Sequence, residues 1–408
     1  MTNSPKAGSF QLMKSINRTL ILNTIRKENL ISRAEIAKKT KLTPPTVTNL
    51  VNELLEANLV KESEMGISKG GRKPILLSIN ATGFYVIGVD VGVQKLRVVM
   101  TDLSANIIEE IVVPLLNGIT KEELIQVIKE NIHSVINISK INRVKIIGVG
   151  VGMHGIVDYK KGIAIYAPNL HLKNIALKEE LEKEFQLPVK VENDAKALAL
   201  GENWFGYGLD VDHMVCINVG IGVGAGIIFK DRLFHGLNGI AGEIGHTLVD
   251  INGPICACGN YGCLQTLCAG EAIRNYAIDE IDLGRETVIM DLVKNDISKI
   301  EAKTIHDAAK CGDELAVEIL EKSGRFLGIG IANLINSLNP QLVVLSGGIS
   351  KAENFILEPV KNEVQKRVLT DEAKKTPILI SNLGDRGTVI GAVTLVLSEL
   401  FIPENVSH

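Results

Sequence analysis

The chain has 408 residues, which is too long for one ordinary hydrophobic core and favours two or three domains. Hydrophobic residues make up 46% of it, so a globular protein is expected. No apolar run reaches the eighteen or so residues that a membrane span needs, and the first ten residues lack the apolar core of a signal peptide. We therefore expect a cytoplasmic protein without a membrane partner, whose six cysteines do not indicate a disulfide framework.

The charge is distributed unevenly along the chain. Residues 1–80 contain 13 Lys and Arg against 6 Glu and no Asp, a net charge of +7. Residues 81–408 contain 31 basic and 41 acidic side chains, a net charge of -10. A basic head on an acidic body indicates that the head meets a polyanion, although a solvated charged surface would give the same count.

Two short helices are predicted in the basic head. Ser32 opens a capping-box pattern that starts a helix over residues 33–39. Thr43 is expected to cap a second helix over residues 43–57. Its apolar residues recur at helical spacing and form one stripe: Val47, Leu50, Val51, Leu54 and Leu55. A helix over residues 12–25 would brace the pair through the inward-facing side chains of Leu12, Ile16, Leu20 and Ile25.

The other face of the 43–57 helix is suited to contacts with nucleic acid. Its small, uncharged hydrogen-bonding groups can reach base edges and phosphates, and they belong to Thr43, Thr46, Thr48, Asn49 and Asn52. The basic, glycine-tipped segment 69–74 leads into a strand over 75–79 and resembles a wing, in which Arg72 and Lys73 would contact DNA. A helical protein–protein module is the alternative. The helix caps, the apolar stripe, the polar face of the 43–57 helix and the basic wing all indicate the same fold. We therefore interpret residues 1–80 as a winged helix-turn-helix DNA-binding domain.

Strands and helices alternate from residue 84 onward. The first series has strands over 85–89, 96–101 and 107–113, a helix over 122–138 and a strand over 144–151. The second has strands over 214–218 and 225–229, a helix over 313–336 and a strand over 341–346. Each series has a glycine-containing turn after its first strand, at 90–92 and at 220–226. This pattern predicts a two-lobed α/β fold of the actin-like (ribonuclease H-like) ATPase and sugar-kinase class. We expect the first lobe to span 84–195, completed by about 382–408, and the second to span 196–381.

One histidine and three cysteines form a candidate metal site in the second lobe. His246, Cys256, Cys258 and Cys263 can supply the four ligands of a tetrahedral structural zinc ion. The glycines between the second and third cysteine allow the loop to fold back over the ion. A redox pair and incidental buried thiols are the alternatives. We predict structural Zn²⁺ bound by these four residues.

Three motifs, END (192–194), GEIGH (242–246) and CxCGNxGC (256–263), occur in this order. Together with the GGRKP wing they resemble the ROK family of repressors, open reading frames and kinases, over nearly the whole chain. In members that bind sugars, the matching END and GEIGH positions contact sugar hydroxyls, with which carboxylates and carboxamides pair well. The resemblance therefore implies sugar contacts at Asn193, Asp194, Glu243, His246 and Gln265, although the family usually has glutamate at the last position. His246 would turn one ring nitrogen to zinc and the other to the sugar.

The two glycine turns depart from those of the family's kinases, which carry DxGGTK and GTGxGxG. The first turn has Val93 and Gln94 where kinases have glycine and threonine, and the second has Ile221 where they have threonine. Phosphoryl transfer depends on positioning and charge neutralisation at these atoms, so the resemblance implies that catalysis is lost and that the protein is not an enzyme.

We therefore predict a sequence-specific repressor of carbohydrate-utilisation genes, whose operator binding is modulated by a sugar bound in a kinase-like cleft. An active sugar kinase with a DNA-binding domain, and a repressor that senses a sugar-transport protein, are the alternatives. The Asp90-Val91-Gly92-Val93 turn and Asn252-Gly253-Pro254 are most similar to the xylose-repressor branch, with glucose and an N-acetylated hexosamine as other effectors. Two half-sites of operator DNA need two recognition helices about one DNA turn apart, so a homodimer or larger homo-oligomer is expected.

Overall fold

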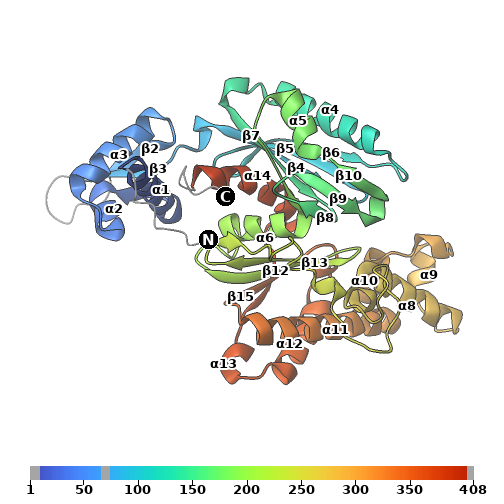
Figure 1. Cartoon of the computed structure of the whole chain (residues 1–408). Coiled ribbons are helices and arrows are strands. Elements are labelled where there is room, and N and C mark those ends of the chain that lie inside the picture. Colours follow the sequence, from blue (N-terminus) through green and yellow to red (C-terminus); the bar gives the residue numbers. More distant parts are fainter. Residues whose placement is uncertain (1–9, 66–73, 402–408) are drawn as a thin grey trace, which may run out of the picture. The chain divides into compact units, whose positions relative to one another are not determined.

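The computed structural model describes residues 10–65 and 74–401 (Figure 1). The chain divides into two compact units, Met1–Glu192 with Ala392–His408, and Asn193–Gly391. The domain boundaries expected near residues 84, 196 and 382 remain a prediction. Within the described part of the chain, no helix combines the length and the apolar character needed to cross a membrane.

The head of the first unit contains three helices and a small antiparallel sheet. The helices are α1 (Phe10–Glu28), α2 (Arg33–Thr40) and α3 (Pro44–Glu56). The strands are β1 (Ile31–Ser32), β2 (Val60–Met65) and β3 (Ile75–Ile79), in the order β1-β3-β2. Ser32 and Glu35 form a complete capping box at α2, and the Thr43 side chain accepts the N–H of Thr46 at the start of α3. The predicted helices, their caps and the following strand are confirmed.

The core of the head is made by the predicted stripe of α3. Four of its side chains are buried, namely Val47, Leu50, Val51 and Leu54. The inward face predicted for α1 is wrong in part, because Ile16 and Leu20 are 41% and 40% exposed, whereas Ile21 and Ile25 are fully buried. Each step of four residues advances about 40° around a helix, so a line drawn through every fourth residue turns away from the buried face. The side chain of Leu12 lies outside the described part of the chain.

The rest of the first unit is built on a five-stranded sheet in the order β11-β7-β4-β5-β6. Its strands are β4 (Tyr85–Val91), β5 (Lys95–Asp102), β6 (Ile107–Pro114), β7 (Ile146–Met153) and β11 (Val189–Asn193). The helices α4 (Lys121–Ser139) and α5 (Leu177–Phe185) share a buried cluster with one face of β4 and β7 (Figure 1). A second antiparallel sheet contains β8 (Ile156–Asp158), β9 (Ile163–Ala167) and β10 (Leu172–Ile175).

Glycines on the opposite face of β7 allow α14 (Gly387–Leu400) to approach the strand closely. A β-carbon at Gly148 would lie 2.8 Å from Val396, and one at Gly150 would lie 1.7 Å from the carbonyl oxygen of Ala392. No real structure tolerates such distances, so only glycine fits at Gly150. The last helix of the chain therefore packs directly on the backbone of the sheet.

The second unit has a five-stranded sheet in the order β14-β13-β12-β15-β16. Its strands are β12 (His213–Val219), β13 (Val223–Phe229), β14 (Arg232–Leu233), β15 (Leu342–Ser346) and β16 (Ile378–Ile380). One face packs on α6 (Asp194–Phe205), and the other packs on α8 (Gly270–Asp282), α10 (Ala302–Lys310), α11 (Glu314–Leu338) and α12 (Asn354–Arg367). The short helices are α7 (Gln265–Cys268), α9 (Ile289–Leu292) and α13 (Asp371–Lys374). Each unit thus contains a five-stranded sheet between helices, which confirms the two predicted α/β lobes.

Candidate functional site

The polar face predicted for DNA contact lies on the solvent side of α3. Thr43, Thr48, Asn49 and Asn52 are exposed, and Thr46 is half-buried. The Thr43 and Thr46 hydroxyls bond one another at 2.8 Å, and the Thr48 hydroxyl donates to the Pro44 carbonyl at 2.9 Å. The carboxamides of Asn49 and Asn52 make no hydrogen bond to the described residues, so they are available to base edges. Arg72 and Lys73 lie outside the described residues.

The first half of β13 brings two of the predicted sugar-binding motifs together. A β-carbon at Gly224 would lie 3.0 Å from the β-carbon of Ala195, the residue that follows Asp194. The next residue of the strand, Ala225, donates its backbone N–H at 2.9 Å to the carbonyl oxygen just before Glu243. The start of α6 and the GEIGH segment therefore both lie against β13.

Asn193 caps α6, and Asp194 is the first residue of the helix. The Asn193 side-chain oxygen accepts the backbone N–H of Lys196 at 3.1 Å, and its amide nitrogen donates to Asp194 Oδ1 at 2.9 Å. The same Asp194 oxygen accepts the N–H of Ala195 at 2.9 Å. Asn193 thus caps α6, and the hydrogen bonds from the Asn193 amide and the Ala195 N–H orient the Asp194 carboxylate.

Lys196 ties α6 to the loop that precedes the GEIGH segment. Its side chain is 3% exposed, and its ammonium donates to the carbonyl oxygen of Gly239. A buried charge costs free energy unless it is paired or hydrogen-bonded, so this contact holds the loop against the helix. Sequence reasoning missed this contact, since it joins residues 43 positions apart.

The carboxylate of Glu243 has no partner within the described residues. The side chain is half-buried, and it makes neither a hydrogen bond nor an ion pair to the described residues. It stands just before the short 3-10 helix η4 (Ile244–His246). A carboxylate partly removed from water gains free energy from any donor that reaches it, so this position suits a ligand that offers hydroxyl groups.

The four predicted metal ligands meet at one point. Their donor atoms all lie within 4.8 Å of one another. Cys256 Sγ is 3.6 Å from His246 Nδ1, and Cys258 Sγ is 3.7 Å from Cys263 Sγ. In a tetrahedral zinc site with Zn–S of about 2.3 Å and Zn–N of about 2.0 Å, donor atoms lie about 3.5–3.8 Å apart. The cluster therefore fits a metal ion of this geometry, and the tetrahedron uses the Nδ1 atom of His246.

The protein environment affects the cysteines of this cluster in opposite ways. The backbone N–H of Asn260 lowers the pKa of the Cys258 thiol to about 6, so this residue is a thiolate at neutral pH. Burial raises the pKa of the Cys263 thiol. A metal ligand must be deprotonated, so the lowered pKa of Cys258 suits it to bind a metal ion.

Gln265 lies between the metal cluster and the second glycine turn. Its amide nitrogen donates to Cys256 Sγ at 3.3 Å. Its amide oxygen would lie 3.1 Å from a β-carbon at Gly222 and 3.1 Å from one at Gly245. We predicted this residue only as a sugar contact. No local sequence pattern predicts its contact with the metal ligand Cys256.

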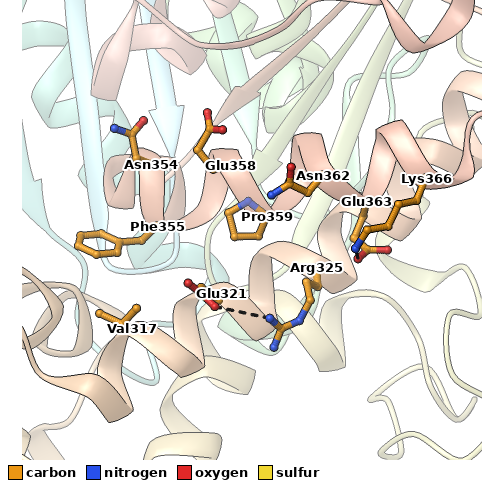
Figure 2. Close-up of a pocket in the computed structure, with 10 residues that line it drawn as sticks. All are labelled: Val317, Glu321, Arg325, Asn354, Phe355, Glu358, Pro359, Asn362, Glu363 and Lys366. Carbon is orange, nitrogen blue, oxygen red and sulfur yellow. Dashed lines mark hydrogen bonds and ion pairs between the residues drawn. The ribbon is translucent and has the colours of Figure 1, made fainter. Parts of the chain in front are cut away.

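A surface hollow between α11 and α12 lies apart from these residues. Figure 2 shows that its lining comes from the two helices, and none of the predicted site residues belongs to it. Its charged side chains pair with one another, Arg325 with Glu321 at 3.6 Å and Lys366 with Glu363 at 3.0 Å. Paired charges leave little to attract a ligand, so this hollow is not the candidate site.

The chain is similar to known regulators over nearly its whole length. It is 35% identical over 393 residues to a protein named putative xylose repressor from Caldicellulosiruptor sp. (strain Rt8B.4), covering 96% of this chain and 98% of the relative. It is 33% identical over 389 residues to the DNA-binding transcriptional dual regulator NagC of Escherichia coli (strain K12), covering 95% and 94%.

Solved structures support the same relationship. A ROK family transcriptional regulator, described as a homolog of E. coli MLC protein, superposes with a TM-score of 0.83 at 28% identity and covers 96% of this chain and 97% of its own. A ROK family glucokinase from Streptomyces griseus, in complex with glucose and AMPPNP, gives a TM-score of 0.69 at 31% identity and covers 76% and 98%. The kinase thus matches the body of the chain, and the regulator also matches its head.

Sequence models of two families match the chain. The model for winged helix-turn-helix DNA-binding covers residues 15–61, and the model for the ROK family covers residues 86–399. The body has the actin-like sugar-kinase fold of that family. The chain therefore belongs to the ROK family and carries a winged helix-turn-helix DNA-binding domain at its N-terminus.

Proposed function

We propose that this protein is a transcriptional repressor of sugar-utilisation genes, which binds operator DNA in the cytoplasm and responds to a sugar. The observation that carries the sugar response is the half-buried carboxylate of Glu243, which has no hydrogen-bond or ion-pair partner among the described residues. β13 holds it near the oriented carboxylate of Asp194. Exposed carboxamides on α3 support DNA recognition. Similarity to proteins named xylose repressor and NagC supports both parts.

The sugar site that we propose lies in the second unit. Its contacts are Asn193, Asp194, Glu243, His246 and Gln265, the last through its amide oxygen because its nitrogen already donates to Cys256. Four hydrogen-bonding side chains besides histidine can take diverging sugar hydroxyls in pairs. Zinc held by His246, Cys256, Cys258 and Cys263 would fix the loop that carries two of these contacts.

A sugar that binds this site is expected to change the affinity for operator DNA. Xylose is the first candidate because of the relatives' printed names, with N-acetylglucosamine and glucose, free and phosphorylated, as the others. A sugar at a hundred times its dissociation constant stabilises the protein by roughly 2.7 kcal/mol, which a thermal melt detects. The same sugar should change operator affinity about 5–150-fold, because couplings of this kind are worth about 1–3 kcal/mol. The proposal is contradicted if none of these sugars changes both the melting temperature of the protein and its affinity for operator DNA.

A dimer or larger homo-oligomer is part of the same proposal. Recognition of two half-sites requires two α3 helices about one DNA turn apart. The single chain carries one such helix in its described residues.

Kinase activity is expected to be absent. The first glycine turn has Val93 and Gln94 where the family's kinases have glycine and threonine, so it lacks a hydroxyl and a close-approach glycine for phosphate. The second turn carries an exposed Ile221 instead of a hydroxyl. We expect no sugar phosphate to form with saturating MgATP and any sugar that raises the melting temperature. Turnover at the usual kinase rate of about 1–100 per second would instead favour an active kinase.

A further inference from the structure

A single side chain joins the metal cluster to the second glycine turn. Gln265 donates its amide N–H to Cys256 Sγ at 3.3 Å, while its amide oxygen lies 3.1 Å from the position that a β-carbon would take at Gly222 or at Gly245. The orientation follows from chemistry, because a thiolate can only accept hydrogen bonds and the nitrogen is the donating end of a carboxamide. The contact therefore uses both ends of one neutral group.

The Gly222 contact is specific to this side chain. Among the described residues, a β-carbon at Gly222 would have one neighbouring atom within 4 Å. This atom is the amide oxygen of Gln265, at 3.1 Å. Gly245 is more crowded, since its β-carbon would also lie 2.1 Å from the carbonyl oxygen of Val223. The backbone of Gly222 is not in the left-handed region, so alanine can adopt its conformation. The steric conflict of the alanine methyl group is with the amide oxygen of Gln265.

We propose that Gln265 is a positioning residue, which fixes the Cys256 ligand and links it to the glycine turn at residues 220–222. The inference rests on the proposed metal centre. Three thiolates and one neutral imidazole around Zn²⁺ leave one negative charge on the cluster, and a donated N–H offsets part of it. Partners of this kind orient metal ligands, and their loss typically lowers metal affinity about 10–100-fold.

The identity of residue 265 then determines the lability of the ion. A leucine would fill similar space without a donor, so it should leave the Cys256 sulfur without this hydrogen bond and weaken its binding to the ion.

The test measures zinc release from the zinc-loaded full-length protein to excess 4-(2-pyridylazo)resorcinol, followed by its absorbance. Gln265→Leu is expected to release zinc about 10–100-fold faster than the unmodified protein. Gln126→Leu, a change on the exposed surface of α4, is the matched control and should release zinc at the unmodified rate. Circular dichroism of each loaded variant checks that it is folded.

A double-mutant comparison tests the link to the glycine turn. Gly222→Ala should by itself accelerate zinc release, because the new methyl group displaces the amide of Gln265. In the Gln265→Leu background it should add nothing, since the amide is already gone. Equal acceleration in both backgrounds overturns the link, and an unmodified release rate in Gln265→Leu overturns the positioning role. If the unmodified protein binds no zinc, the metal centre itself is wrong, which distinguishes the two failures.

Discussion

Cys258→Ser is expected to abolish stoichiometric zinc binding and to lower the melting temperature of the protein. The pKa of the Cys258 thiol is lowered to about 6, and its sulfur lies 3.7 Å from that of Cys263. A serine hydroxyl is not a thiolate, so the remaining three ligands would hold the ion far more weakly. A metal present at a thousand times its dissociation constant stabilises the folded state by about 4.1 kcal/mol, and this stabilisation would be lost. Metal content is measured by atomic emission, and stability by a thermal melt.

The same substitution should also remove the response to sugar. Glu243 and His246 lie in the segment that the metal would hold, so their geometry depends on the ion. Cys311→Ser is the matched control, because Cys311 is an exposed cysteine outside the cluster and should keep both zinc and the sugar response. Full zinc occupancy in Cys258→Ser would show that the cluster does not bind the ion as proposed.

Asp194→Asn is expected to keep operator binding and to lose most of the sugar response. Hydrogen bonds to charged groups are worth about 1.5–3 kcal/mol, so replacing the carboxylate should weaken sugar binding roughly 10–100-fold. The helix itself should survive, because Asn193 supplies the cap and an asparagine oxygen can still accept the N–H of Ala195. Sugar affinity is measured by calorimetry, and operator affinity by titration with and without sugar.

The control for this variant is Asp210→Asn, which removes an exposed carboxylate elsewhere in the second unit. It should leave the sugar affinity unchanged. If Asp194→Asn binds sugar and releases DNA normally, the Asp194 carboxylate serves only the start of α6.

Local patterns predicted those features whose causes are local. The caps of α2 and α3 and the buried stripe of α3 follow from side chains within one or two turns of a helix. The metal cluster was also predictable, because its ligands lie within eighteen residues and few other chemistries use that set. The buried face of α1 was not predictable, because apolar residues occur on more than one face of that helix and tertiary packing determines which face is buried.

Contacts between distant segments carried no signal in a single sequence. The Gln265 amide meets Gly222, Gly245 and Cys256 because β13, η4 and the cysteine loop converge there. The sequence shows that Gln265 replaces the family's usual glutamate, but it does not show that this side chain contacts Cys256. Likewise, only the fold shows that the Asn193 side-chain oxygen accepts the Lys196 N–H and so caps α6.

The arrangement of the two units has a consequence for how the protein is made. Residues 193–391 form an insertion within the first unit, so the sheet that contains β7 receives the end of α14 only when the last segment of the chain has been synthesised. At about 5–20 residues per second, the glycine face of β7 stays uncovered for roughly 10–40 s after its own unit has otherwise emerged. The inserted unit is one continuous segment and does not share this delay. The head does contact the late segment, because the Asn23 amide donates to the Phe401 carbonyl oxygen at 3.1 Å. A chain truncated before residue 392 would therefore lack the segment of α14 that covers the glycine face of β7.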